Sequence, residues 1–216
     1  AYEIMSSDWS SDVRSSDLDL QFPSMESAAL LHWMARNRLS LARNHAKTEQ
    51  LGRKLGMVYK NGGHIFEAIL DPDRVADSGR RFWDEHRAWY GLPESGVRDK
   101  AAALQTQFCV SQSDLLDFLA RELIERIAGV WSGADLIDVW GFDTWGSCCA
   151  CENCRSLGND TDQLLHMLSH FRTAVDAAVA TGRLTHDVRL VGCAYEGTSS
   201  LQPPRRPIPS NLSNAG

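Results

Sequence analysis

The sequence predicts an α/β protein, an incomplete (β/α)₈ TIM-type barrel of about five parallel strands alternating with helices. Three observations favour this fold. Strand-like apolar runs alternate along the chain with segments of helical period, as the crossover connections between parallel strands require. An open doubly wound sheet also fits this alternation, but no G-x-G-x-x-G follows the first strand, so its dinucleotide-binding form has no support. A complete barrel needs about 250 residues, more than the 216 in this chain.

The expected strands and helices occupy residues 23–202, the predicted barrel domain. Strand patterns lie at 39–44, 57–60, 106–110, 135–140 and 188–194. Helical patterns lie at 24–40, 48–56, 72–90, 111–132 and 159–182. Two of the helices are the most regular, because their apolar residues recur every three or four positions. These residues are Leu116, Leu119, Leu123 and Ile127 in the first, and Leu164, Leu168, Phe171 and Val175 in the second.

The two ends of the chain show no apolar period. Residues 6–18 read SSDWSSDVRSSDL, with SSD three times, and their composition is that of a disordered segment. The repeat also resembles a peptide that arises when sequencing-adapter sequence is translated. We therefore interpret residues 1–22 as a disordered or non-native leader. If the leader is non-native, it replaces the natural N-terminus, and any targeting signal there is missing from this sequence. We interpret the proline-rich residues 203–216 as a truncated tail.

Composition and charge exclude several classes of function. The hydrophobic fraction of 43% and the charged fraction of 23% are those of a globular protein with its own core. The formal net charge of −6 argues against a nucleic-acid partner, because binding to phosphates requires a basic face. No apolar run approaches the roughly 18 residues that a membrane-spanning helix needs. The sequence therefore predicts neither a nucleic-acid partner nor a membrane span.

Polar and reactive residues follow each predicted strand. Because the carboxyl ends of parallel strands gather at one edge of a sheet, where ligands bind, these residues are expected to share one site. They are Asn44 and His45, then Gly62, Gly63 and His64, then Cys109 and Ser111, then Asp143, Trp145 and a run of cysteines, and finally Cys193, Tyr195 and Glu196. Each residue alone also fits an ordinary loop position. Their coincidence at one edge favours a site.

Five segments resemble, in order and spacing, a bacterial domain-of-unknown-function family. They are NGGHIF, FWDEHRAWYGL, FCVSQSD, DTWGSCCACENCRSLGNDTDQ and VGCAYEGTSSLQPPRRPIPSNL. The resemblance covers roughly residues 25–212. Its most specific parts are the C-x-C-x-x-C-R run that ends at Arg155 and the AY strand followed by PP, here Ala194, Tyr195, Pro203 and Pro204. It implies a glycoside-hydrolase-like barrel, similar in outline to α-glucuronidases and β-hexosaminidases, with further strands past the prolines. The family commonly has His-Pro-Glu where this chain has His86-Arg87-Ala88.

The cysteine run allows three interpretations. Cys149, Cys151 and Cys154 offer three well-spaced sulfurs to a zinc ion, whereas the vicinal Cys148 and Cys149 can rarely both face one ion. Cys109 or Cys193 would complete such a site. Disulfides are the second interpretation and would require an oxidising compartment. Free thiols packed in the loop are the third. A catalytic thiol is disfavoured because the run offers no obvious partner base, and no other cofactor is required.

A pair of carboxylates carries the enzyme hypothesis. Glycoside hydrolysis uses one carboxyl group as acid and a second as nucleophile or base. Asp143 and Glu196 end the fourth and fifth predicted strands and are the candidate pair. Four residues are candidates to bind the sugar through ring stacking or hydrogen bonds: Asn44, His64, Trp145 and Tyr195. By contrast, Asp160 and Asp162 are interpreted as carboxylates at a helix start.

These residues leave three hypotheses about function. The first is a carbohydrate-active barrel, present as an inactive fragment, that would hydrolyse glycosidic bonds in its complete form. The second is a non-catalytic carbohydrate-binding or metal-binding module on the same scaffold. The third is an incomplete chain without activity. The expected partner is a carbohydrate, and zinc is the expected metal if the cysteines bind one.

Overall fold

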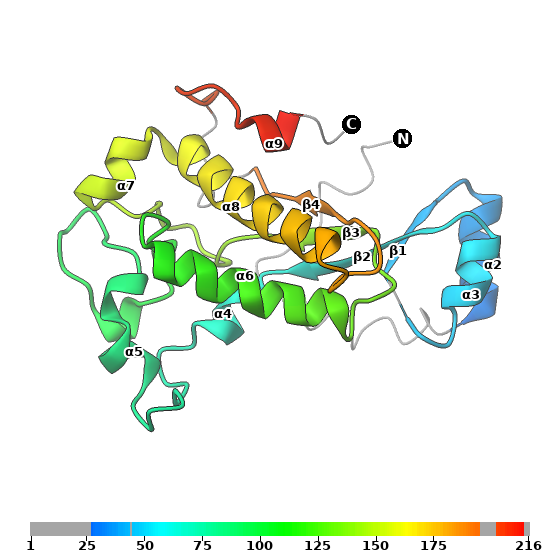
Figure 1. The fold of residues 1–216 in the computed structure, drawn as a ribbon, viewed down its shortest axis with the longest axis horizontal. Coiled ribbons are helices and arrows are strands. Elements are labelled where there is room, and N and C mark those ends of the chain that lie inside the picture. Colours follow the sequence, from blue (N-terminus) through cyan, green and yellow to red (C-terminus); the bar gives the residue numbers. More distant parts are fainter. Residues whose placement is uncertain (1–26, 44, 195–201, 214–216) are drawn as a thin grey trace. The chain divides into compact units, whose positions relative to one another are not determined.

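The structure, a computed structural model, describes residues 27–43, 45–194 and 202–213 (Figure 1). The predicted leader, residues 1–22, lies outside the described residues. The chain divides into two compact units, Ala1–Lys60 and Asn61–Gly216. The elements in order are α2 (Ala28–Arg36), β1 (Leu41–Arg43), α3 (Glu49–Lys54), β2 (Val58–Gly63), α4 (Phe66–Ile69), α5 (Phe82–Glu85), η3 (Arg87–Trp89), η4 (Lys100–Ala102), α6 (Ser113–Ala128), β3 (Leu136–Val139), α7 (Glu152–Leu157), α8 (Asp160–Ala180), β4 (Arg189–Val191) and α9 (Ser210–Ser213).

The strands form one four-stranded parallel sheet in the order β1-β2-β3-β4. The predicted α/β class with parallel strands is therefore confirmed, and each strand lies beside the next one along the chain. β2 is longer than predicted and runs through both glycines of its NGG end. Gly62 has φ +100°, and a Cβ there would collide with the backbone oxygen of Asp138 in β3. A residue without a side chain is thus required where β2 approaches β3.

The third predicted strand, 106–110, is wrong, since β2 pairs directly with β3 in the sheet order. Its apolar residues are buried as expected, but its backbone does not bond to a strand: the Gln107 N–H donates to the carbonyl of Ser147, and the Cys109 N–H to that of Trp89 in η3. The buried Gln107 side chain also accepts the Phe142 N–H at 2.7 Å and donates to the Phe142 carbonyl at 2.9 Å. An apolar run shows burial and does not identify the hydrogen-bond partner of the backbone.

The first unit has its own small core. Met34 of α2 packs with Ala42 of β1 and with Met57 and Tyr59. The Tyr59 hydroxyl reaches α3, where it donates to the carbonyl of Thr48 at 3.1 Å. This hydroxyl lies so close to Gly52 that a Cβ at position 52 would collide with it, which explains a glycine inside a helix despite its low helix propensity.

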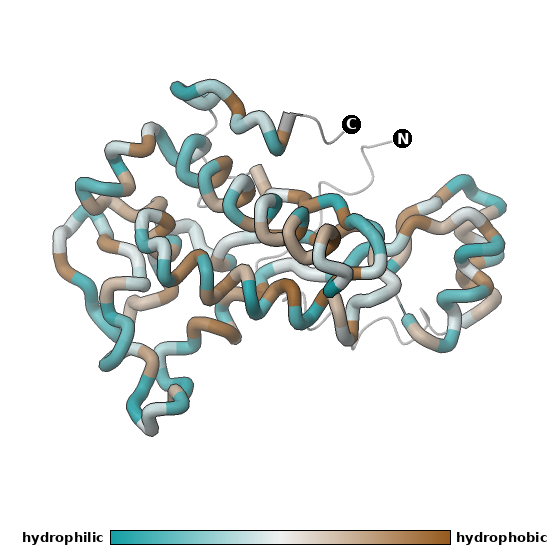
Figure 2. The backbone as a smooth tube through the Cα atoms, viewed as in Figure 1, coloured by the Kyte–Doolittle hydropathy of each residue, from teal (hydrophilic) through white to brown (hydrophobic). Residues whose placement is uncertain are grey.

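The larger core belongs to the second unit, where α6 and α8 lie side by side and cover one face of β3 and β4 (Figure 1). All eight apolar residues predicted to line these two helices are buried. Figure 2 shows apolar and polar residues alternating along both helices. The spacing of about 3.6 residues per turn gathers the apolar ones on the side that faces the sheet.

The predicted helix at 72–90 is wrong for most of its length. Only the short α5 and η3 form there, and residues 91–112 contain no regular element other than η4. Aromatic packing holds the stretch instead. Trp89 stacks on His86 at 3.8 Å between ring centroids and donates from Nε1 to the Asp114 carboxylate at 2.7 Å. Ring contacts are not periodic in sequence, so the pattern of apolar residues could not predict them.

Asp162 anchors residues 202–206 to the start of α8. With Asn159 it forms a capping box, as expected for a carboxylate at a helix start. Its carboxylate also accepts the backbone N–H groups of Arg205 at 3.1 Å and Arg206 at 3.0 Å. Burial tends to raise the pKa of Asp162, but these N–H donors outweigh it and lower the pKa below its usual range.

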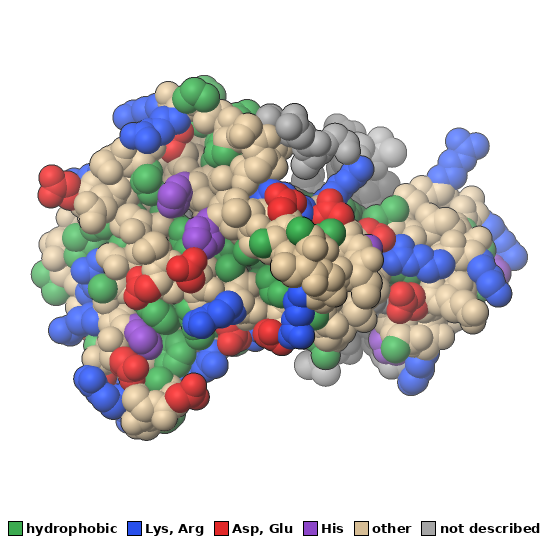
Figure 3. Space-filling model, viewed as in Figure 1, with side chains coloured by type: hydrophobic (Ala, Val, Ile, Leu, Met, Phe, Trp, Pro, Cys, Tyr) green, Lys and Arg blue, Asp and Glu red, His purple; other side chains and the backbone are tan. Residues whose placement is uncertain are grey.

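The surface of the second unit mixes both signs of charge. On the face shown in Figure 3, acidic and basic side chains are interspersed. Several form ion pairs, as Arg183, after the end of α8, does with Glu125 of α6, and as Arg126 does with Glu122 within α6. Exposed pairs of this kind contribute little stability each. Among the described residues, no helix combines the length and apolar character needed to cross a bilayer.

We predict that Asp162→Asn lowers the free energy of unfolding by about 2 kcal/mol at pH 7, because the amide keeps one acceptor and turns a donor toward backbone N–H groups. Asp160→Asn, in the same helical turn, is the matched control. Burial and then the charge of Glu94 raise the pKa of Asp160, so losing its charge should cost little. Urea denaturation measures both variants.

The Asp162→Asn effect should shrink as the pH falls through the folded-state pKa of Asp162. A carboxyl whose pKa is lowered by folding stabilises above its unfolded pKa and loses that contribution in acid. Equal stability of the two variants at pH 7 would contradict the anchoring role.

Candidate metal centre

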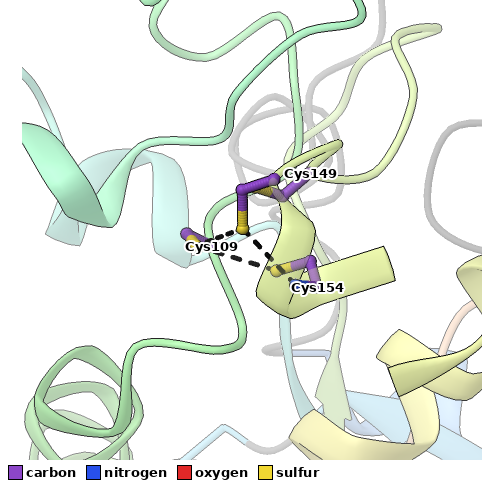
Figure 4. A group of neighbouring side chains, drawn as sticks. Cys109, Cys149 and Cys154 are labelled. Atoms are coloured by element: carbon purple, nitrogen blue, oxygen red, sulfur yellow. Dashed lines mark hydrogen bonds between the residues drawn. The ribbon is translucent and has the colours of Figure 1, made fainter. Parts of the chain in front are cut away.

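Four cysteine thiols converge at one point of the second unit. The sulfur atoms of Cys109, Cys149, Cys151 and Cys154 all lie within 4.8 Å of one another. Cys109 Sγ is 3.6 Å from Cys151 Sγ and 3.7 Å from Cys154 Sγ. Figure 4 shows Cys109, Cys149 and Cys154 pointing toward a common centre from separate segments. These four cysteines could bind a metal ion.

The C-x-C-x-x-C spacing builds three corners of this centre through a helix cap. Cys151 is the N-cap of α7, and its sulfur accepts the Cys154 N–H at 3.4 Å. Cys154 lies in the first turn of α7 and is fully buried, so its sulfur faces inward, beside the sulfur of Cys151. Cys149 precedes this turn, and its sulfur accepts the Leu92 N–H at 3.2 Å. The spacing of the run thus sets the local geometry before any metal binds.

Cys109 supplies the fourth corner from the segment before α6. That segment is held in place by the Gln107 side chain and by the bond from the Cys109 N–H to Trp89. Ser111, two residues on, places its Oγ 3.3 Å from the sulfurs of Cys109 and Cys154 and 3.6 Å from that of Cys151. One hydroxyl therefore covers the face that three of the sulfurs form.

The thiols share protons unevenly. Hydrogen bonds from the thiols of Cys149 and Cys154 lower the pKa of Cys109. The same bond to Cys109 raises the pKa of Cys149 to about 11 and also raises that of Cys154. The hydrogen bonds among these thiols thus favour loss of the proton from Cys109 over loss from Cys149 or Cys154.

Two of the six sulfur–sulfur distances match those around a tetrahedral metal ion. A tetrahedron with metal–sulfur bonds of about 2.3 Å has sulfur–sulfur edges of about 3.8 Å. The two contacts of Cys109 with Cys151 and Cys154, at 3.6 and 3.7 Å, come close to that edge. Three of the four cysteines are buried and Cys151 is half-buried, so an ion there would be shielded from water.

The structure extends the predicted cysteine set. The three predicted sulfurs, those of Cys149, Cys151 and Cys154, do come together, and Cys109 joins them rather than Cys193. None of the six cysteines, all of which lie within the described residues, is in a disulfide, so the structure contains no example of the disulfide interpretation. Cys148 is buried outside the group, and burial raises the pKa of its thiol. The expectation that vicinal cysteines do not share one centre agrees with this arrangement.

A second group of predicted site residues lies at the carboxyl ends of β2 and β3. His64 follows β2, and its Nε2 lies 3.9 Å from an oxygen of Asp143, which follows β3. The His64 Nδ1 bonds to the carbonyl of Gly141 at 2.7 Å, and the ring meets Trp140 edge-on at 5.1 Å. A carbonyl only accepts, so Nδ1 carries the proton and Nε2 is the atom turned toward the carboxylate.

Sequence reasoning missed Glu67 at this edge. Its carboxylate accepts the Asp143 N–H at 2.6 Å, which brings a second carboxyl group beside Asp143. The sequence did contain a signal for Glu67: it lies three residues after His64, a predicted site residue, and in the first turn of α4. Trp145 is 75% exposed and Asp143 is 49% exposed in its side chain. The other predicted site residues, Asn44, Tyr195 and Glu196, lie outside the described residues.

Comparisons with protein-family models, with curated proteins and with solved structures give no match to this chain. The family resemblance therefore rests on the quoted sequence segments alone. The geometry of the described residues carries the inference about function.

Proposed function

We propose that Cys109, Cys149, Cys151 and Cys154 bind one zinc ion that stabilises this α/β domain. The observation that carries the proposal is the convergence of four sulfurs within 4.8 Å, from two segments 40 residues apart at their nearest, Cys109 and Cys149. Four thiolates in a tetrahedron are the usual ligands of structural zinc. The site would fasten the loop after β3 to the segment before α6.

A structural role fits the surroundings of the sulfurs better than a catalytic one. Catalytic zinc keeps one position open for water or substrate, whereas four protein ligands fill a tetrahedral site. Backbone N–H groups of Leu92 and Cys154 donate to Cys149 and Cys151, and the Ser111 hydroxyl lies against three of the sulfurs. The two backbone N–H donors draw charge from thiolates and lower their reactivity.

The sheet order supports an incomplete (β/α)₈ barrel as the scaffold. In a barrel every strand is followed by its neighbour, whereas a doubly wound sheet reverses its strand order at a switch point. The order β1-β2-β3-β4 contains no reversal. We propose that these are four consecutive strands of a barrel.

A second candidate function is hydrolysis of glycosidic bonds at the carboxyl ends of β2 and β3, or carbohydrate binding there without catalysis. The meeting of His64, Asp143 and Glu67 favours this proposal, because paired carboxyl groups with a nearby base are the machinery of glycoside hydrolysis. Trp145 beside them offers an exposed ring on which a sugar can stack. Glu196 stays a candidate for the second carboxylate.

We predict that the purified protein binds about one zinc ion per chain and that Cys154→Ser abolishes this binding. The loss should lower the melting temperature by about 10 °C, as expected if about 4 kcal/mol of stability is lost from a domain of this size. Metal analysis by mass spectrometry and a thermal melt measure the two effects.

Cys148→Ser is the matched control for this experiment. Cys148 is buried beside the ligand Cys149 but lies outside the sulfur group, so the variant should keep its zinc. Zinc retained by Cys154→Ser, or lost equally from both variants, would contradict the proposed ligand set. Iron in place of zinc would contradict the choice of metal but not the choice of ligands.

For the second candidate function, we predict that Asp143→Asn, made in a protein that carries the whole barrel, lowers kcat on an aryl glycoside by more than about tenfold, or 1.4 kcal/mol. The incomplete barrel of this chain is expected to be inactive. Glu67→Gln and Glu196→Gln then show which carboxyl group is the partner, because the true partner should cause a loss of similar size. Asp77→Asn, on an exposed turn, is the control. Activity unchanged in all three variants would rule out this carboxylate site.

A further inference from the structure

A pocket of about 390 Å³ lies in the irregular part of the second unit. Its size falls within the range of about 300–1,000 Å³ typical of small-molecule sites. The residues that line it come from one stretch of chain, between α5 and the segment before α6. They include Trp83, Tyr90, Arg98, Asp99, Gln105 and Thr106. None of the residues assigned to the metal centre or to the carboxyl ends of β2 and β3 lines this pocket.

Arg98 supplies the positive charge of the pocket wall. The side chain is half-buried, and its Nε donates to the Tyr90 carbonyl at 2.7 Å, which fixes the plane of the guanidinium. Within the described part of the chain no carboxylate forms an ion pair with Arg98. The one carboxylate in the wall, Asp99, accepts the Ala101 N–H at the start of η4. Two guanidinium N–H₂ groups thus remain for an anionic group.

The rest of the wall suits an apolar body. Trp83 and Tyr90 are buried and lie 5.0 Å apart between ring centroids. The Tyr90 hydroxyl is buried and has no hydrogen-bond partner among the residues that the structure describes. Burial raises the pKa of Tyr90, so the hydroxyl stays a neutral donor. No area of this hydroxyl is open to the pocket, so the Arg98 guanidinium is the donor that a ligand there would meet.

We propose that this pocket binds a small organic carboxylate, with the carboxylate on the Arg98 guanidinium and the apolar body against the aromatic wall. Arg98 would make two parallel N–H···O bonds, the geometry in which a guanidinium distinguishes a carboxylate from a neutral group. The aromatic rings would favour a ring-containing ligand over a simple inorganic anion.

The walls of the pocket are joined to the metal centre. Leu92, between two lining residues, donates its N–H to Cys149 Sγ and accepts the Ala150 N–H at 2.7 Å. On the other wall, the Gln105 carbonyl accepts the Thr144 hydroxyl at 3.3 Å. The two walls approach closely, because a Cβ at Gly91 would collide with the Gln107 carbonyl. If the proposed zinc site is correct, losing the metal should therefore weaken binding in the pocket.

Saturation-transfer NMR with benzoate and its neutral counterpart, benzyl alcohol, tests the proposal on the whole chain. We expect benzoate to bind with a Kd of about 1 mM, as befits a ligand of its size, and at least about tenfold more tightly than benzyl alcohol. Arg98→Gln should reduce the preference to less than about twofold, and Arg98→Lys should keep part of it. The melting temperature of each variant shows that it is folded.

Several results would overturn the proposal. They are equal binding of benzoate and benzyl alcohol, no benzoate signal at about 20 mM, and full benzoate binding by Arg98→Gln. Inorganic phosphate that displaces benzoate at the same concentration would point to a simple anion site and overturn the choice of carboxylate. The zinc content of the wild type separates the two proposals. A wild-type protein that binds benzoate with the expected Kd of about 1 mM but holds no zinc would refute the zinc proposal and leave this one standing.

Discussion

Four sulfur atoms hold together the part of the second unit that has the least regular structure. Residues 91–112 contain no regular element other than η4, so few of their backbone groups are satisfied by a helix or a sheet. Cys109 fixes one end of this stretch and Leu92 the other, both through sulfurs of the cysteine group. Binding free energy at a structural zinc site is folding free energy, and a loss of about 4 kcal/mol is a large part of the roughly 5–15 kcal/mol that stabilises a typical domain. One ion could therefore decide whether this stretch folds.

The same constraint positions both candidate sites. The loop after β3 begins beside His64 at Asp143 and ends at Cys149, and the side chain of Gln107 clamps its start through Phe142. A Cβ at Gly146, midway along this loop, would collide with the carbonyl of Gln105, a residue that lines the pocket of about 390 Å³. The carboxyl edge of the sheet, the cysteine centre and the pocket are thus three surfaces of one closely packed loop system.

Periodicity predicted the parts of this fold whose partners are local. The faces of α6 and α8 follow from apolar residues three or four apart, and three of the cysteines follow from a spacing that a helix cap enforces. The segment 106–110 was assigned to the sheet because it is as apolar as a strand, yet a glutamine side chain and two carbonyls outside the sheet satisfy it. Leu92 and Glu67 join their sites through contacts distant in sequence, which a single sequence does not encode as a pattern. For the fourth sulfur the sequence left two candidates, Cys109 and Cys193, and only the fold distinguishes them.

The most direct test of the account is X-ray absorption at the zinc edge on the protein as purified. The account predicts a first shell of four sulfur atoms at about 2.3 Å with no nitrogen or oxygen ligand. That result would establish all four thiolates as ligands of one ion. A shell with nitrogen or oxygen atoms at about 2.0–2.1 Å, or a protein that holds no metal at all, would contradict it.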